Sequence, residues 1–129
     1  LAGKSDVLIA GCDLNTLPPG TEKTSNFPDS ACKGKDADFV MDDYTRELSW
    51  LEPFYEAYND VIPLATYQAD EARYYTHTTN GNGYWNRRLD YLFSTGRWQK
   101  GAVHQGDAKG PPSMKISDHA PISGELILP

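Results

Sequence analysis

The sequence predicts a single domain of the α/β (α+β) class, in which one helical segment is followed mainly by strands. Its 129 residues fit one domain of ordinary size. The apolar pattern runs from a short strand through a long polar loop and a helix into several strands. Aliphatic residues are few, but 12% of the chain is aromatic, and aromatic side chains bury large areas. We therefore expect a folded, aromatic-rich core. No apolar run approaches the ~20 residues of a membrane helix, so we expect no membrane span.

The first half of the chain predicts a strand, a loop and a helix. Residues 6–11 form a short apolar run ended by glycine, which is typical of a buried strand. Residues 16–37 are rich in Pro, Gly, Ser, Thr and Lys, and indicate a long surface loop. Apolar residues then recur at helical spacing over 42–58, with an aspartate available as the N-terminal cap. Pro53 should end or kink this helix, or begin a second short one.

The second half predicts a short helical stretch and a series of strands. Residues 63–72 add a helical turn or two, and Asn-Gly-Asn-Gly within 79–84 is a strong turn signal. Residues 107–113, with Gly-Pro-Pro, indicate a loop. Apolar and β-prone runs predict the strands 73–78, 88–94, 98–104 and 120–128.

Charge and cysteine content exclude some classes of function. Twelve Lys+Arg against eighteen Asp+Glu give a net charge of -6, so the chain has no overall field that attracts nucleic acid. Local binding of phosphate through a metal or a few aimed cations stays open. Cys12 and Cys32 fit neither a CxxC nor a zinc spacing. They could form one disulfide or stay as two buried thiols, so they do not fix the compartment, and an exported or extracellular location is one option.

Two polar pairs lie beside the predicted strands. Asp13 and Asn15 follow the first strand. A carboxylate there can take a proton from water or bind a metal, and an amide can donate to a phosphate oxygen. Arg88 and Asp90 alternate within a later strand and would share one of its faces. Taken singly, a turn explains the first pair and a surface ion pair the second.

A third pair, Asp118 and His119, begins the last predicted strand. Asp suits a hard cation such as Mg²⁺, and His can move a proton or donate to a phosphoryl oxygen. Only three histidines occur in the chain, so a histidine beside an aspartate is notable. A loop aspartate next to a half-exposed histidine explains the pair about equally well.

Together and in this order, the three segments resemble the C-terminal half of the endonuclease/exonuclease/phosphatase superfamily. That group includes pancreatic-type deoxyribonucleases, abasic-site endonucleases, inositol polyphosphate 5-phosphatases and neutral sphingomyelinases. Its pattern is G-D-x-N after a strand, then R-x-D-Y, then S-D-H-x-P, and a Thr-Tyr or Thr-Trp segment precedes the second motif. The similarity covers nearly the whole chain. The matching residues are Gly11, Asp13 and Asn15 (with Cys12 inserted), Tyr75-Thr76-His77, Arg88, Asp90 and Tyr91, and Ser117, Asp118, His119 and Pro121.

The resemblance implies the C-terminal half of a four-layer α/β/β/α sandwich with mixed, largely antiparallel sheets. It also implies metal-dependent hydrolysis of a phosphate ester. By that resemblance Asp13 orients or deprotonates the attacking water, and Asn15 holds that water or the phosphate. His119 contacts the phosphoryl group or acts as acid or base, and Asp90 fixes its orientation through a hydrogen bond. We therefore expect Asp13, Asn15, Asp90, Asp118 and His119 to converge in one cleft.

The implied cofactor is Mg²⁺ or Mn²⁺, held by Asp118 and Asp13. Arg88 is expected to contact the substrate together with Asn15 and His119. The principal metal-binding Glu of the family precedes these motifs and has no counterpart in residues 1–129, so we expect an N-terminal half of the domain outside this chain. Alone, the chain should then bind Mg²⁺ weakly and be nearly inactive. The sheet face that packs on the other half should be exposed or covered by self-association.

The substrate stays open among nucleic acid, phospholipid and inositol phosphate, and among diesters and monoesters. A rival hypothesis is a non-catalytic relic or binding module that keeps the fold. Five residues argue against loss of activity, because nothing structural requires all of them together: Asp13, Asn15, Asp90, Asp118 and His119. A third interpretation treats the motifs as coincidence in a small α+β domain, and scattered site residues would favour it.

Overall fold

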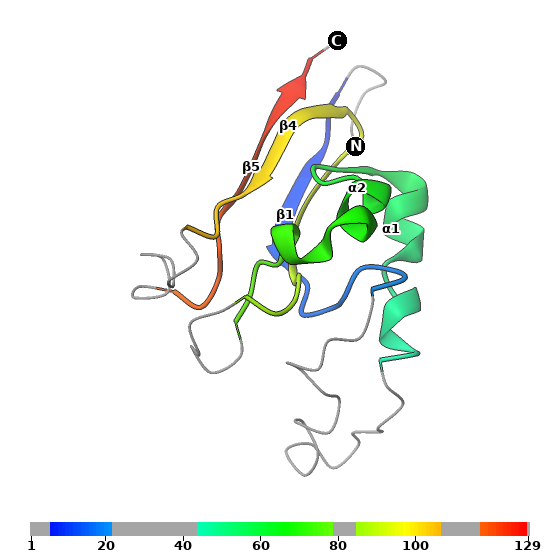
Figure 1. Ribbon diagram of the computed structural model, residues 1–129. Helices are drawn as coiled ribbons and strands as arrows, with labels where there is room; N and C mark the ends of the chain where they lie inside the picture. The colour runs from blue at the N-terminus through cyan, green and yellow to red at the C-terminus, as the bar shows by residue number, and fades with distance from the viewer. Residues whose placement is uncertain (1–5, 22–43, 79–84, 107–116, 129) are drawn as a thin grey trace.

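A computed structural model describes residues 6–21, 44–78, 85–106 and 117–128. Their fold is a small mixed α+β arrangement with two antiparallel sheets and two short helices (Figure 1). The three-stranded sheet has the order β1 (Ile9–Asp13), β3 (Asp90–Ser94), β2 (Asn59–Asp60). The two-stranded sheet pairs β4 (Arg97–Val103) with β5 (Ile122–Ile127). No helix in the described ranges is long and apolar enough to cross a bilayer.

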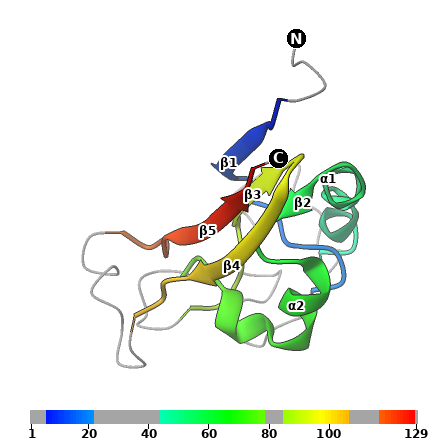
Figure 2. The same cartoon turned by 90° about the horizontal axis from the view of Figure 1, so that it is seen from above.

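The two α-helices are each six residues long and lie on one side of the strands (Figure 2). Helix α1 (Glu52–Ala57) begins with Pro53 in its first turn, where a missing N–H costs nothing. A 3-10 turn over Glu47–Ser49 precedes it. Helix α2 (Leu64–Ala69) is followed by a 3-10 turn over Glu71–Tyr74. Within the described part of 42–58 the helical segment is two short pieces, and Pro53 lies at the start of the second, which is one of the outcomes expected for it. The helical prediction for 63–72 is confirmed.

The core is aromatic, as the composition predicts. One buried cluster contains Val61, Ile62, Tyr67 and Tyr75, and partly buried aromatic and aliphatic side chains pack around it. A second cluster contains Leu51, Tyr91 and Phe93. The rings of Tyr91 and Phe93 stack with their centroids 5.6 Å apart, and Tyr55 meets Phe93 edge-on at 5.3 Å.

Two glycines allow the sheets to pack closely. A Cβ at Gly101 in β4 would overlap the Val61 carbonyl, and one at Gly124 in β5 would overlap the Val61 side chain. The chain just after β2 therefore lies directly against the β4–β5 pair, and the two sheets meet at this point.

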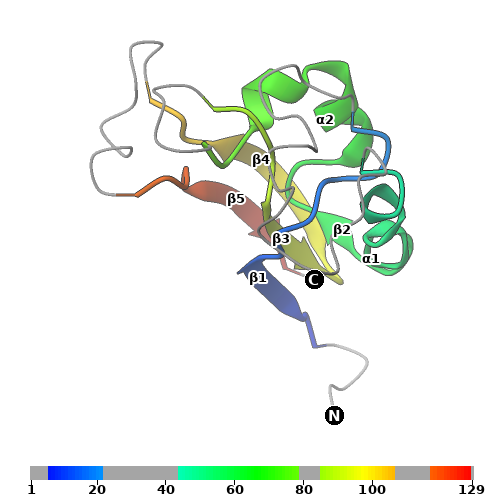
Figure 3. The ribbon, with the colours of Figure 1, turned by 90° about the horizontal axis from the view of Figure 1, so that it is seen from below.

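The predictions for the last three strands are confirmed to within a few residues, but two others are wrong. Residues 73–78 do not form a strand, because the chain is helical to Tyr74 and then extended, with isolated bridges at His77. Strand β1 is not buried: all five of its residues are exposed. Among the described strands it pairs only with β3, and it lies at the margin of the described fold (Figure 3). The turn over 79–84, the loop over 107–113 and most of the loop over 16–37 lie outside the described residues.

Several large apolar side chains are exposed near the first and last described residues, just before and in β1 and at the end of β5. Leu8 and Ile9 are more than half exposed, and Ile127 and Leu128 are 48% and 70% exposed. The backbones of Leu8 and Thr95 are hydrogen-bonded, and Val7 and Leu126 both approach Gly96. An exposed apolar surface of this kind is expected from the sequence, whereas self-association stays a prediction.

Candidate functional site

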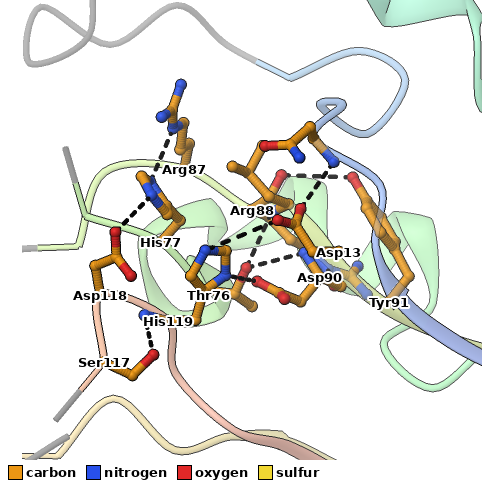
Figure 4. Close-up of polar contacts among 12 residues, drawn as sticks. Asp13, Thr76, His77, Arg87, Arg88, Asp90, Tyr91, Ser117, Asp118 and His119 are labelled. Carbon is orange, nitrogen blue, oxygen red and sulfur yellow. Dashed lines mark hydrogen bonds and ion pairs between the residues drawn. The ribbon is translucent and has the colours of Figure 1, made fainter. Parts of the chain in front are cut away.

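The site is built where β1 ends and β3 begins. In the antiparallel register Asp13, the last residue of β1, lies directly opposite Asp90, the first residue of β3. The extended segment Tyr75–Thr78 lies between the chain before β3 and the chain before β5. The Thr76 carbonyl accepts a hydrogen bond from Ala120 N–H at 2.7 Å, and Thr78 N–H donates one to the Asp118 carbonyl at 3.1 Å. This pairing brings His119 to Asp13 and Asp90 (Figure 4).

His119 lies between the two aspartates. Its Nδ1 is 2.8 Å from Asp90 Oδ2, and its Nε2 is 3.8 Å from Asp13 Oδ2. A carboxylate accepts hydrogen bonds, so Nδ1–H donates to Asp90 and leaves Nε2 facing Asp13. The three side chains are 20–33% exposed, so solvent reaches them. The expected bond between His119 and Asp90 is therefore present, and 3.8 Å is too long for a direct hydrogen bond to Asp13.

Thr76 holds the backbone of Leu89 and Asp90 in place. Its buried hydroxyl accepts hydrogen bonds from the N–H groups of Leu89 and Asp90, at 2.9 and 3.1 Å. The sequence contained Thr76 only as part of a family-like segment and did not indicate this role. The contact joins residues that lie far apart in the chain, and no local spacing signals it.

His77 and Asp118 form the other side of the site. His77 Nε2 is 3.5 Å from Asp118 Oδ2, and Arg87 Nε donates to His77 Nδ1 at 3.1 Å. The His77 ring meets the His119 ring edge-on, with centroids 4.6 Å apart. Burial lowers the pKa of His77 below its ordinary value, and the positive charges of Arg87 and His119 lower it further. His77 is thus a site neighbour that sequence reasoning named only within the family-like segment.

Asn15 lies beside Asp13 in a tight turn. Its backbone has φ 49°, and its N–H donates to Asp13 Oδ1 at 2.8 Å. Asparagine tolerates this left-handed conformation better than most residues, so the turn explanation accounts for its backbone. The same bond orients the Asp13 carboxylate. The Asn15 side chain is exposed near the site, and its proposed contact with water or phosphate stays a prediction.

The prediction that Arg88 contacts a substrate is wrong. Its side chain is fully buried, and its Nη2 is 2.8 Å from Asp60 Oδ1, which is also fully buried. The guanidinium lies over the Tyr91 ring at 4.6 Å and donates to the Ile62 carbonyl. Burial opposes the charge of Arg88, but the interactions with Asp60, Tyr55 and Tyr91 together outweigh burial and raise the pKa of Arg88. Arg88 Nε donates to the backbone carbonyl of Asp90 at 3.3 Å, whereas the Asp90 carboxylate is bonded to His119. Because Arg88 precedes β3, strand alternation does not apply to the pair.

Cys12 is exposed, contrary to the expectation that it is buried. It is a free thiol in β1, which pairs with β3 on one side only. Cys32 lies outside the described residues.

Asp118 and Asp13 carry carboxylates, the kind of ligand that a hard divalent cation prefers. The Asp118 side chain is 61% exposed and the Asp13 side chain 33% exposed. Mg²⁺ in proteins uses one or two carboxylates and fills its other positions with water and substrate phosphate oxygens. A different set, comprising His77, Asp118 and His119, places one ligand atom of each residue within 4.8 Å of the others.

Comparison of the chain with protein-family models, curated proteins and solved structures finds no match. The functional assignment therefore depends on the motifs and on the geometry of the site.

Proposed function

We propose that this chain contributes to the divalent-metal-dependent hydrolysis of a phosphate ester, as part of an endonuclease/exonuclease/phosphatase-type domain. The observation that supports this most strongly is the alignment of Asp90, His119 and Asp13. Residues from three separate motifs meet there, with a hydrogen bond at 2.8 Å and an approach at 3.8 Å. An imidazole held by one carboxylate and facing another is suited to proton transfer.

In the proposed reaction, Asp13 accepts a proton from the attacking water. The water oxygen forms a bond to phosphorus, and the ester P–O bond breaks with its electron pair passing to the leaving oxygen. His119 in its protonated form donates the Nε2 proton to that oxygen. Asp90 holds the ring through Nδ1 and stabilises its positive charge, since the two atoms are 2.8 Å apart. Asn15 positions the water or a phosphate oxygen.

Asp118 and Asp13 would hold the metal ion. When bound, Mg²⁺ or Mn²⁺ would neutralise charge that grows on the phosphoryl oxygens. Two carboxylates are few fixed ligands, so we expect weak Mg²⁺ binding by this chain alone. Titration calorimetry that gives micromolar Mg²⁺ affinity for the chain would contradict this expectation.

We also propose that the two sheets belong to a four-layer α/β/β/α sandwich. Support comes from the exposed residues of β1 and from the exposed side chains of Leu8, Ile9, Ile127 and Leu128. Exposed apolar surface, where it is large, is usually covered in a finished assembly. Sedimentation measures whether a second copy covers it. A strictly monomeric chain that binds no apolar dye would argue against this proposal.

The function is tested by assaying the natural protein that contains the chain. The substrates are p-nitrophenyl phosphate and bis(p-nitrophenyl) phosphate, with Mg²⁺ and with EDTA. We expect metal-dependent turnover that His119→Ala lowers by about 10²–10⁴-fold. His104→Ala is the matched control, because the exposed His104 ring contacts Ser123 and not the site. Undiminished turnover in His119→Ala would contradict the mechanism, and phosphate binding without turnover would favour a binding module.

A further inference from the structure

The side chains of His77, Asp118 and His119 gather on the face of the site away from Asp90. One ligand atom of each lies within 4.8 Å of the others, and the two rings are in edge-on contact at 4.6 Å. Figure 4 shows the side chains of His77, Asp118 and His119 near one another. We infer that they form a binding site for a divalent transition metal of the imidazole-preferring class, such as Zn²⁺ or Co²⁺.

The ligand types favour such a metal over Mg²⁺. Imidazole is a preferred ligand of Zn²⁺ and its neighbours, whereas Mg²⁺ selects oxygen. Two histidines and one carboxylate leave at least one coordination position open, and zinc in such sites completes its shell with water. The site therefore differs in class from the oxygen site proposed at Asp13 and Asp118, although both use Asp118.

The surroundings orient two of the ligands and leave the third accessible. Asp90 accepts from His119 Nδ1, so the other nitrogen of His119 keeps its lone pair. A carboxylate on the far nitrogen of a metal-binding histidine is the usual supporting contact. The His77 side chain is 12% exposed and fixed by its neighbours, while that of Asp118 is 61% exposed and gives a route of entry.

Arg87 opposes metal binding. Its Nε donates to His77 Nδ1 at 3.1 Å, so in the neutral ring the proton is on Nε2, the atom that faces Asp118. A metal at Nε2 must replace this proton and displace the Arg87 contact. The positive charge of Arg87 also repels a dication. Removing Arg87 should therefore strengthen binding, which a nonspecific surface site would not show.

The inference does not depend on the proposed hydrolysis. If hydrolysis occurs, however, a metal at His119 Nε2 withholds the atom that acts on the substrate. Zn²⁺ or Co²⁺ should then inhibit a reaction that Mg²⁺ supports.

The test is titration of the metal-free, untagged chain with Co²⁺ and Zn²⁺, followed by calorimetry and by the visible absorption of Co²⁺. Both cysteines are replaced by serine, which removes thiolate ligands such as the exposed Cys12. We expect one equivalent to bind, and His77→Ala and His119→Ala each to weaken binding by about tenfold or more. Arg87→Gln should tighten binding, and His104→Ala should leave it unchanged.

His77→Ala could lose metal binding because the chain misfolds, since His77 is mostly buried. Asp118→Asn tests the site without this risk, because the side chain of Asp118 is largely exposed. It too should weaken binding and shift the Co²⁺ spectrum. Equal binding by the parent and the His77→Ala chain, or equal losses in His77→Ala and His104→Ala, would overturn the inference. Co²⁺ binding by the chain, together with no metal-dependent turnover by the natural protein, would reject only the proposed function. If the parent chain does not bind Co²⁺ but the natural protein loses turnover in His119→Ala, only this inference is rejected.

Discussion

Two polar clusters flank the start of β3, and they differ in how much solvent reaches them. In the buried cluster, the side chains of Arg88 and Asp60 are both fully inaccessible. In the open cluster, those of Asp13, Asp90 and His119 are 20–33% exposed. The R-x-D-Y motif supplies both, because Arg88 belongs to the first cluster and Asp90 to the second. One sequence motif therefore serves the stability of the fold and the candidate site at once.

The buried cluster has its hydrogen bonds satisfied within the protein. Asp60 accepts from Arg88 at 2.8 Å, from the Tyr55 hydroxyl at 2.7 Å and from Ile62 N–H at 3.2 Å. The guanidinium also lies over Tyr91, a contact that gains strength away from water. A cluster with this many internal partners has no evident capacity to bind a ligand, and its role is structural.

The open cluster is arranged differently, because two of its acceptors face one another. With Nδ1–H donated to Asp90, His119 Nε2 and Asp13 Oδ2 approach to 3.8 Å with no proton between them in the neutral state. Only a proton, a water molecule or a cation between them makes such a pair favourable. Incomplete satisfaction of hydrogen bonds, more than the presence of charged residues, therefore distinguishes the candidate site from the buried cluster.

The largest expected effect is on the buried cluster. Arg88→Met should lower the free energy of unfolding by about 3–5 kcal/mol, because it leaves Asp60 buried without its charged partner. Urea denaturation followed by circular dichroism measures this. The double variant Arg88→Met/Asp60→Leu should recover much of the loss, since an apolar pair avoids the desolvation of two charges. A loss in the double variant as large as in the single one would show that the charges are not the cause.

In the open cluster the corresponding change should affect activity and leave stability nearly intact. Asp90→Asn keeps the size of the side chain but weakens the bond that orients His119. We expect turnover to fall by about 10–100-fold with a stability change below about 1 kcal/mol. Kinetics of the natural protein, with denaturation of the same variant, separates the two. A loss of stability matching that of Arg88→Met would erase the distinction between the clusters.

Thr76 offers an intermediate case, because its hydroxyl supports the backbone between the clusters. Thr76→Val leaves the buried N–H groups of Leu89 and Asp90 without their acceptor. The free energy of unfolding should fall by about 1–3 kcal/mol. Thr76→Ser keeps the hydroxyl and is the matched control. If Thr76→Ser loses as much stability as Thr76→Val, the packing around residue 76 and not the hydrogen bonds determines the loss.

The sequence predicted the strands better than the environment of the side chains. The run from Tyr91 to Phe93 predicts a strand from its own residue types, without any distant contact. In the same local way, Pro53 predicts the start of helix α1. Strand β2 has only two residues and forms through its pairing with Ser94 and Phe93, which no local pattern contains. The apolar run in β1 was expected to be buried, but burial depends on what covers a sheet and not on the run itself.

The sequence predicted which residues form the candidate site, but it did not predict which of them contact one another or lie buried. The motifs identified Asp13, Asp90 and His119, because their spacing resembles a known family. They did not reveal that Arg88 is buried against Asp60, since Asp60 lies in no motif. They also gave no role to His77, whose contacts with Asp118 and His119 arise from long-range backbone pairing.

The last effect concerns the phenols around the buried cluster, and it is absent below about pH 10. Burial raises the pKa of Tyr55, Tyr67 and Tyr91 above the ordinary value, because the charged phenolate is desolvated there. The unfolded chain releases these protons near pH 10, whereas the folded protein retains them. Their contribution to stability is thus complete below about pH 10 and is lost progressively as the pH rises above it. Ultraviolet titration should show these three phenols ionising only as the protein unfolds, with stability falling by up to about 1.4 kcal/mol per pH unit for each. Ionisation of all tyrosines near pH 10 in a chain that stays folded would show that water reaches the buried cluster, and the contrast with the open one would fail.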